Sequence, residues 1–308
     1  MAESNSGAAQ DSGVLMQLSG DLARAVERSA AATVTVYARR RQAASGVVWG
    51  ANGTILTADH VIERDEEIQV GLADGRRVAA TVVGRDPGTD LALLRMQGSE
   101  PAAIERGPLP GVGTLVLAVA RPDGDGPMAT LGVVSAVGGP VRTGRGGQLE
   151  KFIRSDAILY PGFSGGPLID GAGRAVGINT SHLARGSGIA IPVETAARVA
   201  EAILSHGHVR RGYLGVSSQP VPLPAAAAAK AGGQASGLLV LRVESDGPAE
   251  KGGMIIGDIL VSLAGEPVRD IDDLQRLLAG DRVGQAVTAA VLRGGEPHNL
   301  TATIGERT

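Results

Sequence analysis

Between Ala32 and Val193 the chain consists of short runs rich in β-branched residues, separated by glycine, asparagine or aspartate. Typical runs are TVTVY, SGVVW, GTILTA, DLALLRM, GTLVLAVA and RAVGINT. Short strands with turn residues at this spacing are typical of an all-β barrel or sandwich. The chain's 46 glycines supply the backbone freedom that tight turns and close strand packing require. We therefore predict a mostly β fold for this part of the chain.

The two ends of this β-rich part have a different character. Residues 1–13 are small and polar, and we predict that they are disordered. Residues 14–29 place apolar side chains near helical spacing and predict one amphipathic helix. Residues 194–207, ETAARVAEAILSHG, predict a second helix, with Gly207 as its stop signal.

A second unit follows residue 206. The runs YLGVS, GLLVLRVE, DILVSLAG and AVTAAVLRGG predict strands, and PLPAAAAAKAG and DIDDLQRLLAG predict two helices. A length of 308 residues agrees with about two domains. We predict a first domain over residues 14–206, which includes the N-terminal helix, and a second over residues 207–308.

Composition excludes several classes of function. The chain has no cysteine, so disulfides, zinc–thiolate sites and cysteine nucleophiles are ruled out. A net charge of −3 and an aromatic content of 2% argue against a nucleic-acid partner. His206 and His208 form an H-x-H pair, which we interpret as part of a solvated linker. We therefore expect neither a metal site nor an organic cofactor.

Targeting signals are also absent from the sequence. No run of about 18 apolar residues occurs, so we expect no transmembrane segment. The first residues, MAESNSGAAQDSG, lack the basic and apolar regions of a secretory signal peptide. The sequence as it stands therefore predicts a cytoplasmic protein. The alternative is a protein of the periplasm or cell envelope whose leader has been trimmed.

The segment PGFSGGPL, residues 161–168, surrounds Ser164 with glycines. A nucleophilic serine must lie on a sharp turn, with neighbouring backbone N–H groups directed at the oxyanion that develops during attack on a carbonyl. Glycines permit such backbone angles and keep side chains away from the substrate. Taken alone, the segment is equally compatible with a glycine-rich turn between two strands.

A serine nucleophile requires a base and an orienting carboxylate. His60 stands in TADHVI, directly after an apolar strand, at a place where a strand end faces a cleft. Asp90, in DPGTDLALL, opens a strongly apolar strand, and a buried carboxylate there requires a hydrogen-bonding partner such as His60. The alternative is that Asp90 caps the preceding turn, with Asp86 in a similar role nearby. The order His60, Asp90, Ser164 is that of the chymotrypsin triad.

These segments resemble the HtrA/DegP-like serine proteases, in which a chymotrypsin-like protease domain precedes a PDZ domain. ILTADHVI, GRDPGTDLALLRM and SDAILYPGFSGGPLID resemble that family's His, Asp and Ser segments, and RRGYLGV and GPAEKGGMIIGDILVSLAGEPVRDIDDL resemble its PDZ domain. The resemblance extends over nearly all of residues 20–305. It implies a double β-barrel protease domain followed by a sandwich-like PDZ domain with two helices.

The resemblance also assigns catalytic roles. Ser164 would be the nucleophile, His60 the general base and Asp90 the orienting carboxylate, in a mechanism that passes through an acyl-enzyme. The turn formed by Gly162, Phe163 and Ser164 would supply the oxyanion hole through the N–H groups of Gly162 and Ser164. Loss of such donors lowers turnover by about 10²–10³.

Two residues of this turn depart from the family. Phe163 stands where the family usually has asparagine, and Tyr160 replaces another asparagine. Only the backbone of residue 163 is needed for the oxyanion hole, so the chemistry is still expected. We expect the large apolar side chain to alter the resting conformation of the loop, and hence the resting activity.

Alignment with the family places Ile158, Leu159 and Ile189 in the S1 pocket. None of the three is acidic, so we predict small or medium aliphatic P1 residues rather than lysine or arginine. The alternative is that all three are core residues of the barrel.

In the PDZ domain, a peptide would be bound by β-augmentation. The resemblance assigns the groove strand to residues 239–243 and the groove helix to residues 270–279. The alternative is a PDZ unit that packs against the protease domain and binds little. The residues that match the carboxylate-binding loop are Tyr213, Leu214, Gly215 and Val216.

We therefore predict an ATP-independent serine endopeptidase of protein quality control. Its substrates would be unfolded or damaged proteins, and its PDZ domain would bind C-terminal or extended peptides. The family forms trimers, so the resemblance also implies a homotrimer. The alternatives are a latent or inactive protease-like chaperone or adaptor, and a different serine hydrolase such as an esterase.

Overall fold

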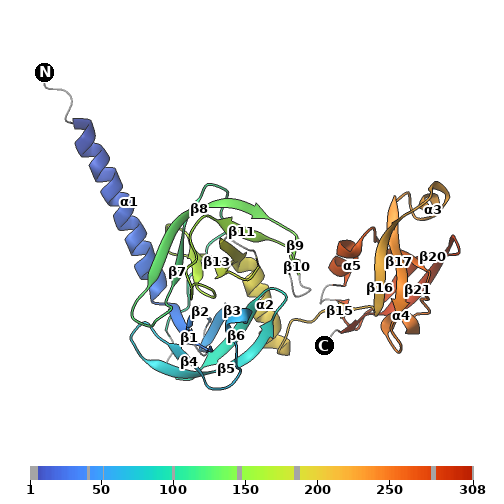
Figure 1. Cartoon of the computed structure of the whole chain (residues 1–308), viewed down its shortest axis with the longest axis horizontal. Helices are drawn as coiled ribbons and strands as arrows, with labels where there is room; N and C mark the ends of the chain where they lie inside the picture. The colour runs from blue at the N-terminus through green and yellow to red at the C-terminus, as the bar shows by residue number, and fades with distance from the viewer. Residues whose placement is uncertain are drawn as a thin grey trace. The chain divides into compact units, whose positions relative to one another are not determined.

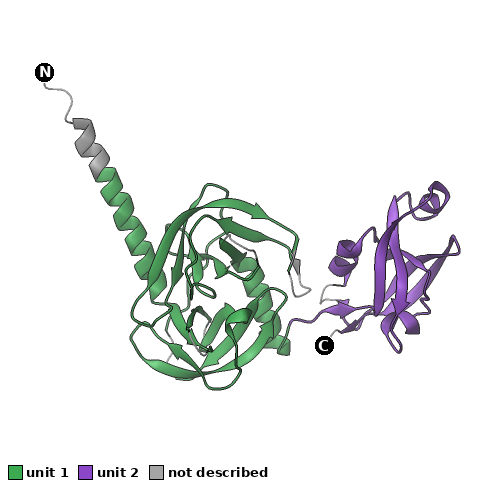
Figure 2. Ribbon diagram, viewed as in Figure 1, with its two compact units in different colours: residues 1–208 green, residues 209–308 purple. Residues whose placement is uncertain are grey.

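The computed structural model describes residues 6–39, 42–50, 52–98, 101–143, 148–183, 188–278 and 282–306. The chain divides into two compact units, residues 1–208 and 209–308, which Figure 2 colours separately. This division lies close to the boundary expected between residues 206 and 207. Each unit has its own hydrophobic core.

Unit 1 begins with helix α1 (Ser6–Ala30), which runs up to the first β-barrel (Figure 1). Residues 6–13, expected to be disordered, are therefore helical, because AAQ in this stretch consists of good helix formers that extend the amphipathic run. Residues 1–5 lie outside the described residues. The C-terminal end of α1 packs on strands β1, β7 and β12, and Ala25 and Ala30 are buried there.

The first barrel is closed, with the strand order β1-β2-β3-β6-β5-β4. Consecutive residues of β3 and β6 are buried because both faces of these strands are covered. Side chains on the inner face fill the barrel, while strand β13 (Ala175–Thr180) packs against β3 and helix α2 (Val193–His206) packs against β6. This double burial explains the continuous apolar runs seen in the sequence. The strands are β1 (Thr33–Tyr37), β2 (Ala44–Gly50), β3 (Thr54–Ala58), β4 (Ile68–Gly71), β5 (Arg77–Asp86) and β6 (Leu91–Met96).

The second barrel is also closed, in the order β11-β14-β13-β12-β7-β8. A short pair, β9 (Val141–Arg142) and β10 (Gln148–Leu149), forms a separate two-stranded sheet. Helix α2 (Val193–His206) follows and ends at Gly207, whose φ of 79° is left-handed, as the predicted stop signal requires. The barrel strands are β7 (Leu115–Ala120), β8 (Met128–Gly138), β11 (Phe152–Ser155), β12 (Pro167–Ile169), β13 (Ala175–Thr180) and β14 (Gly188–Pro192).

Unit 2 is built on a twisted antiparallel sheet in the order β16-β17-β18-β20-β21, with β16 at one edge. The two predicted helices are present as α3 (Ala225–Lys230) and α5 (Ile271–Leu277), and α4 (Pro248–Lys251) was not anticipated. Asp270 begins α5 by accepting a hydrogen bond from Asp273 N. The strands are β15 (Gly212–Tyr213), β16 (Val216–Pro222), β17 (Ser236–Val243), β18 (Ile259–Leu263), β19 (Glu266–Pro267), β20 (Ala286–Arg293), β21 (Glu296–Thr303) and β22 (Gly305–Glu306).

The mostly β fold expected from the sequence is thus confirmed, as a double barrel followed by a second β unit. Among the helices of the described residues, none is both long enough and apolar enough to cross a membrane.

Candidate functional site

His60 and Asp90 form a hydrogen-bonded pair at the edge of the first barrel. His60 lies in the 3-10 turn η1 (Asp59–Val61) directly after β3, and Asp90 directly precedes β6. Strands β3 and β6 pair with Ala58 opposite Leu91, so the two side chains are brought together by the strand register. His60 Nδ1 lies 2.8 Å from Asp90 Oδ2, and the His60 backbone N–H donates to Asp90 Oδ1 at 3.0 Å.

The Asp90 carboxylate is buried yet held in its charged form. Its side chain is 2% exposed, and its backbone adopts a left-handed φ of 59°. Burial alone would raise the pKa of Asp90, but hydrogen bonds from His60 and from the Thr180 hydroxyl outweigh it and hold that pKa below its usual value. An ionised Asp90 can orient the His60 ring and stabilise its protonated form. The turn-capping role considered for Asp90 belongs to Asp86, which accepts a hydrogen bond from Thr89 Oγ1 at 2.7 Å.

Ser164 follows a tight turn between β11 and β12. In this turn Phe163 N donates to Tyr160 O at 3.0 Å, Pro161 occupies the second position, and Gly162 occupies the third with a φ of 90°. Those features define a type II turn, which requires glycine at its third position. Within the part of the chain that the structure describes, neither Gly162 N nor Ser164 N donates to a protein acceptor. Both N–H groups are therefore available for an oxyanion.

The side chain of Phe163, the residue expected to alter the resting conformation of the loop, points into the second barrel. Its side chain is fully buried in the core of the second barrel, beside Leu168 and Ile153. Its ring also meets the ring of Tyr160 edge-on, with centroids 5.9 Å apart. The residue that departs from the family therefore anchors the serine turn to the barrel core.

The end of β13 contributes a segment that the sequence analysis missed. Thr180 donates to Asp90 Oδ2, the Ser181 hydroxyl lies 3.0 Å from Ser164 Oγ, and the His182 ring stacks on His60 with centroids 5.1 Å apart. Three consecutive residues thus contact Asp90, Ser164 and His60, respectively. The polar run TSH at the end of the apolar strand RAVGINT was a usable signal. The His182 side chain is exposed, and its ring covers one face of the His60 ring.

The three residues assigned to the S1 pocket have different environments. Ile158 is 60% exposed, Leu159 packs against the second-barrel core, and Ile189 is 4% exposed on β14. A Cβ atom placed on Gly188 would lie 3.5 Å from Leu159 Cγ, so Leu159 lies beside the residue that precedes Ile189. Ile189 and Leu159 thus contribute to the second barrel, and only Ile158 is largely exposed.

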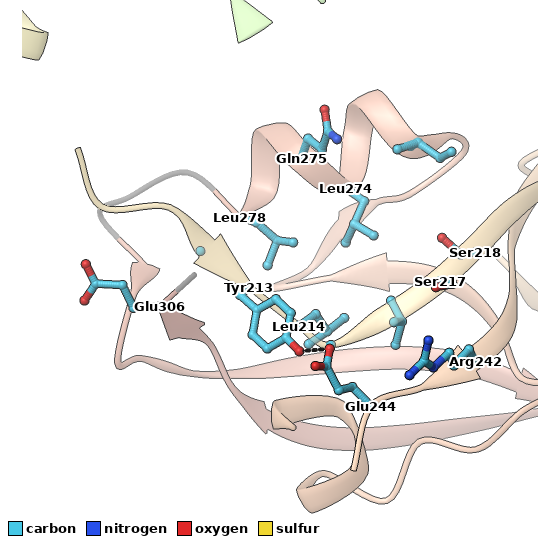
Figure 3. A pocket seen from close by; sticks show the side chains of 14 residues that line it. Tyr213, Leu214, Ser217, Ser218, Arg242, Glu244, Leu274, Gln275, Leu278 and Glu306 are labelled. Carbon is cyan, nitrogen blue, oxygen red and sulfur yellow. Dashed lines mark hydrogen bonds between the residues drawn. The ribbon is translucent and has the colours of Figure 1, made fainter. Parts of the chain in front are cut away.

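Unit 2 contains a groove of about 760 Å³ between strand β16 and helix α5 (Figure 3). Leu274 and Leu278 point from α5 towards the strand that carries Ser217. The assignment of residues 239–243 as the groove strand is wrong, because β17 is paired on both sides, with β16 and β18. The edge strand β16 is the one that has a free side for an added strand.

The four residues assigned to the carboxylate-binding loop lie at one end of this groove. Leu214 is 2% exposed and accepts a hydrogen bond from Ala249 N, while Gly215 accepts one from Glu244 N. The Tyr213 hydroxyl is hydrogen-bonded to the Glu244 carboxylate, as Figure 3 shows. The loop is therefore held in place by backbone and side-chain contacts.

The described residues contain no cluster of histidine and acidic side chains that would hold a metal ion. Of the arginines at positions 39–41, Arg39 donates to the carbonyl of His60 at 3.0 Å. Arg39 therefore supports the backbone of His60. The other two lie outside the described residues.

Comparison with known proteins agrees with this geometry. Residues 44–178 match the trypsin-like peptidase domain, and residues 239–293 match the PDZ domain. A DegP-like periplasmic serine endoprotease of Ectopseudomonas mendocina is 38% identical over 277 residues, which cover 87% of this chain and 58% of the relative. A corresponding protein of Pseudomonas fluorescens is 36% identical, with 87% and 57% covered. The chain thus spans a little over half the length of these relatives.

Solved structures show the same similarity. The HtrA-type protease AlgW with a decapeptide has a TM-score of 0.78 and 34% identity, covering 93% of this chain and 99% of that one. A serine endoprotease from Yersinia pestis has a TM-score of 0.78 and 33% identity, with 93% and 98% covered. A trypsin-like double barrel followed by a PDZ domain defines a PDZ-containing serine protease of the chymotrypsin fold. The chain belongs to the HtrA-type serine protease family.

The prediction of a cytoplasmic location is contradicted by these relatives, which are named as periplasmic. That prediction rested on the composition of residues 1–13, which decides nothing about location.

Proposed function

We propose that this protein is a serine endopeptidase in which Ser164, His60 and Asp90 form the catalytic triad. The observation that carries the proposal is the pairing of the buried Asp90 carboxylate with His60, together with a serine turn that has two unpaired N–H groups. Because Asp90 binds Nδ1 of His60, the free ring nitrogen is Nε2, which is the atom that serves as base in a triad.

The reaction begins when the Ser164 hydroxyl exchanges its hydrogen bond with Ser181 for one with His60. In the resting arrangement the Ser164 hydroxyl contacts Ser181, so rotation of the Ser164 side chain towards His60 precedes proton transfer. Ser164 then attacks the peptide carbonyl, His60 accepts the proton, and the N–H groups of Gly162 and Ser164 stabilise the oxyanion. His60 returns the proton to the leaving amine, and water hydrolyses the acyl-enzyme. No step requires ATP or a cofactor.

We infer a preference for small or medium aliphatic P1 residues. Leu159 and Ile189 are apolar, and none of the three assigned S1 residues carries a charge that would bind lysine or arginine.

The PDZ unit is proposed to bind C-terminal or extended peptides by adding them to the edge of β16. The edge position of β16 and the apolar residues of α5 support this role. The related protease AlgW has been solved with a decapeptide and with a tripeptide.

We propose a periplasmic enzyme, because the relatives are named as periplasmic serine endoproteases. Its role in protein quality control, with unfolded or damaged proteins as substrates, is proposed on the family resemblance. A homotrimer is proposed on the family resemblance, and the exposed Val14, Leu15 and Met16 of α1 offer apolar surface that an assembly would bury. Light scattering coupled to size-exclusion chromatography tests the trimer.

A latent protease that acts as a chaperone is the second candidate, because the Ser164 hydroxyl contacts Ser181 in the resting arrangement. Digestion of casein by the wild type and by Ser164→Ala separates the two. Cleavage by the wild type alone supports the protease, and the cut sites report the P1 preference. Absence of cleavage by both proteins, with a C-terminal peptide ligand added and at raised temperature, would reject the protease.

Ester substrates are tested in parallel. Hydrolysis of esters without cleavage of casein would identify an esterase.

A further inference from the structure

Arg121 is a buried arginine whose guanidinium binds backbone carbonyls. Its residue is 5% exposed, and among the described residues no carboxylate forms an ion pair with it. Nε donates to Thr33 O at 3.0 Å, and Nη2 donates to Ala30 O at 3.2 Å. Ala30 is the last residue of α1, where the helix dipole places partial negative charge. The guanidinium thus ties the end of α1 and the first residue of β1 to the residue that directly follows β7 of the second barrel.

The backbone of Arg121 is bound from the other side by Ser45. Arg121 N donates to Ser45 Oγ at 2.9 Å, and Ser45 Oγ donates to Gly162 O at 2.8 Å. Ser45 N also donates to Ser164 O at 3.1 Å, and the Ser45 residue is fully buried on β2. One residue of the first barrel therefore holds two carbonyls of the serine turn of the second barrel.

These contacts determine the orientation of the turn. Gly162 is held at its carbonyl by Ser45, and the turn is closed by the hydrogen bond from Phe163 N to Tyr160 O. Ser45 thus fixes the peptide group that directly follows the Gly162 N–H, and this limits rotation of the turn about Gly162. Loss of the Ser45 hydroxyl would leave the part-buried Gly162 carbonyl without this partner, and the Gly162–Phe163 peptide group could rotate and carry the adjacent Gly162 N–H with it.

We propose that Ser45 is a positioning residue for the oxyanion hole, and that Arg121 connects it to the C-terminal end of helix α1. The proposal rests on the proposed function, because it concerns the same serine turn. It adds a structural path by which the N-terminal helix supports the catalytic turn: from Ala30 to Arg121, from Arg121 to Ser45, and from Ser45 to Gly162.

The test compares Ser45→Ala with Thr35→Val in the full chain. Thr35 is a matched control, because its buried hydroxyl donates to Arg121 O at 2.7 Å and no hydrogen bond joins it to the serine turn. We expect Ser45→Ala to lower kcat about 10- to 100-fold with KM within about twofold, and to weaken binding of a peptide boronic acid by the same factor. Thr35→Val should leave both kcat and the affinity for the boronic acid unchanged. The melting temperatures of the two variants should be comparable. Unchanged kcat and boronate affinity in Ser45→Ala would overturn the proposal.

A second readout is independent of turnover. Hydrogen–deuterium exchange of the peptide covering residues 160–166 should accelerate in Ser45→Ala and not in Thr35→Val. If Ser45→Ala fails to fold, Ser45→Cys, which has a similar volume and a weaker donor, takes its place. An inactive wild type with this exchange difference would reject the proposed function and keep the positioning role. Equal exchange in the wild type and the variant would reject the role.

The link through Arg121 has its own variant. We expect Arg121→Met to accelerate exchange both in residues 26–31 and in residues 160–166, with Arg121→Lys closer to the wild type. Faster hydrogen–deuterium exchange in residues 26–31 alone would show that Arg121 only holds helix α1. That result would overturn the proposed connection from α1 to the serine turn.

Discussion

The Ser181 hydroxyl lies 3.0 Å from Ser164 Oγ, and the Ser181 backbone N–H donates to the same oxygen at 3.3 Å. In the arrangement that the structure describes, the proposed nucleophile is thus bound by Ser181, the residue that directly follows β13. An attacking serine must instead donate to the base. The contact with Ser181 therefore competes with the contact that catalysis requires.

Replacing Ser181 by alanine should release the nucleophile. A neutral hydrogen bond contributes about 1 kcal/mol, which corresponds to about a fivefold change in rate. We expect Ser181→Ala to raise the rate of covalent labelling of Ser164 by a fluorophosphonate probe about fivefold. Ser164→Ala is the control and should show no labelling. A rate equal to or below that of the wild type would argue that Ser181 does not restrain the serine.

Gly162→Ala should damage the oxyanion hole. An alanine at position 162 would have to adopt the left-handed φ of 90° that Gly162 has. Its Cβ would also lie 2.4 Å from Pro122 Cβ, so the turn must change its conformation. We expect kcat to fall by about 10²–10³ with a peptide substrate. Gly75→Ala is the control, since Gly75 has a φ of 85° and open space around it. Equal losses in both variants would indicate a general effect of backbone strain.

Asp90→Asn should affect both activity and the pH dependence of stability. Neutral asparagine cannot orient and stabilise the protonated His60, and we expect kcat to fall by about 10⁴. The pKa of Asp90 is lowered in the folded protein, so its contribution to the free energy of unfolding is complete above the unfolded value of about 3.9. That contribution is lost as the pH falls through the folded value.

Urea unfolding of the wild type and Asp90→Asn at a series of pH values measures this contribution. The difference in unfolding free energy between the two should shrink as the pH falls below about 4. Asp74→Asn, at an exposed site, should give a much smaller difference at every pH. A difference for Asp90 that grows as the pH falls would contradict the assignment.

Phe163→Asn, which introduces the family's usual residue, should destabilise this protein. The Phe163 side chain is fully buried among apolar residues of the second barrel, where an amide finds no matching cavity. We expect the free energy of unfolding to fall by about 3–5 kcal/mol. Tyr160→Asn, at a residue 49% exposed, should cost much less. Urea unfolding compares the two, and equal stabilities would show that the turn repacks.

Leu278→Lys should weaken peptide binding by the PDZ unit. Leu278 points into the groove beside β16, and a lysine there places a charge against the apolar side chains of a bound peptide. We expect the Kd of a fluorescent apolar C-terminal peptide to rise at least about tenfold. Arg276→Ala, on the same helix but outside the groove lining, should bind like the wild type. Binding unaffected by Leu278→Lys would place the peptide elsewhere.

Many elements were predictable because their signals are local. The helix over residues 194–207 ended at Gly207 as expected, since a glycine in the left-handed region is a feature of the residue itself. The pairing of His60 with Asp90 was also predictable, because a buried carboxylate at the start of an apolar strand needs a partner. The start of α1 was misplaced, because small polar residues are compatible with both helix and disorder.

The groove strand could not be chosen correctly from local sequence. β16 and β17 both have strand character, and only the order of strands in the sheet decides which one lies at an edge. The direction of the Phe163 side chain was equally inaccessible, because it depends on the cavity that the second barrel provides.

The sequence by itself determined the β-rich double-domain plan, the order of His60, Asp90 and Ser164 along the chain, and the glycine turn that carries Ser164. These follow from periodicity, turn chemistry and the order of a few reactive residues along the chain. The tertiary structure alone decided the contacts of Ser45 with Gly162, 117 residues away, and of Thr180 with Asp90, 90 residues away. Such contacts arise from strand register and barrel closure, which bring distant residues together and leave no local pattern in the chain.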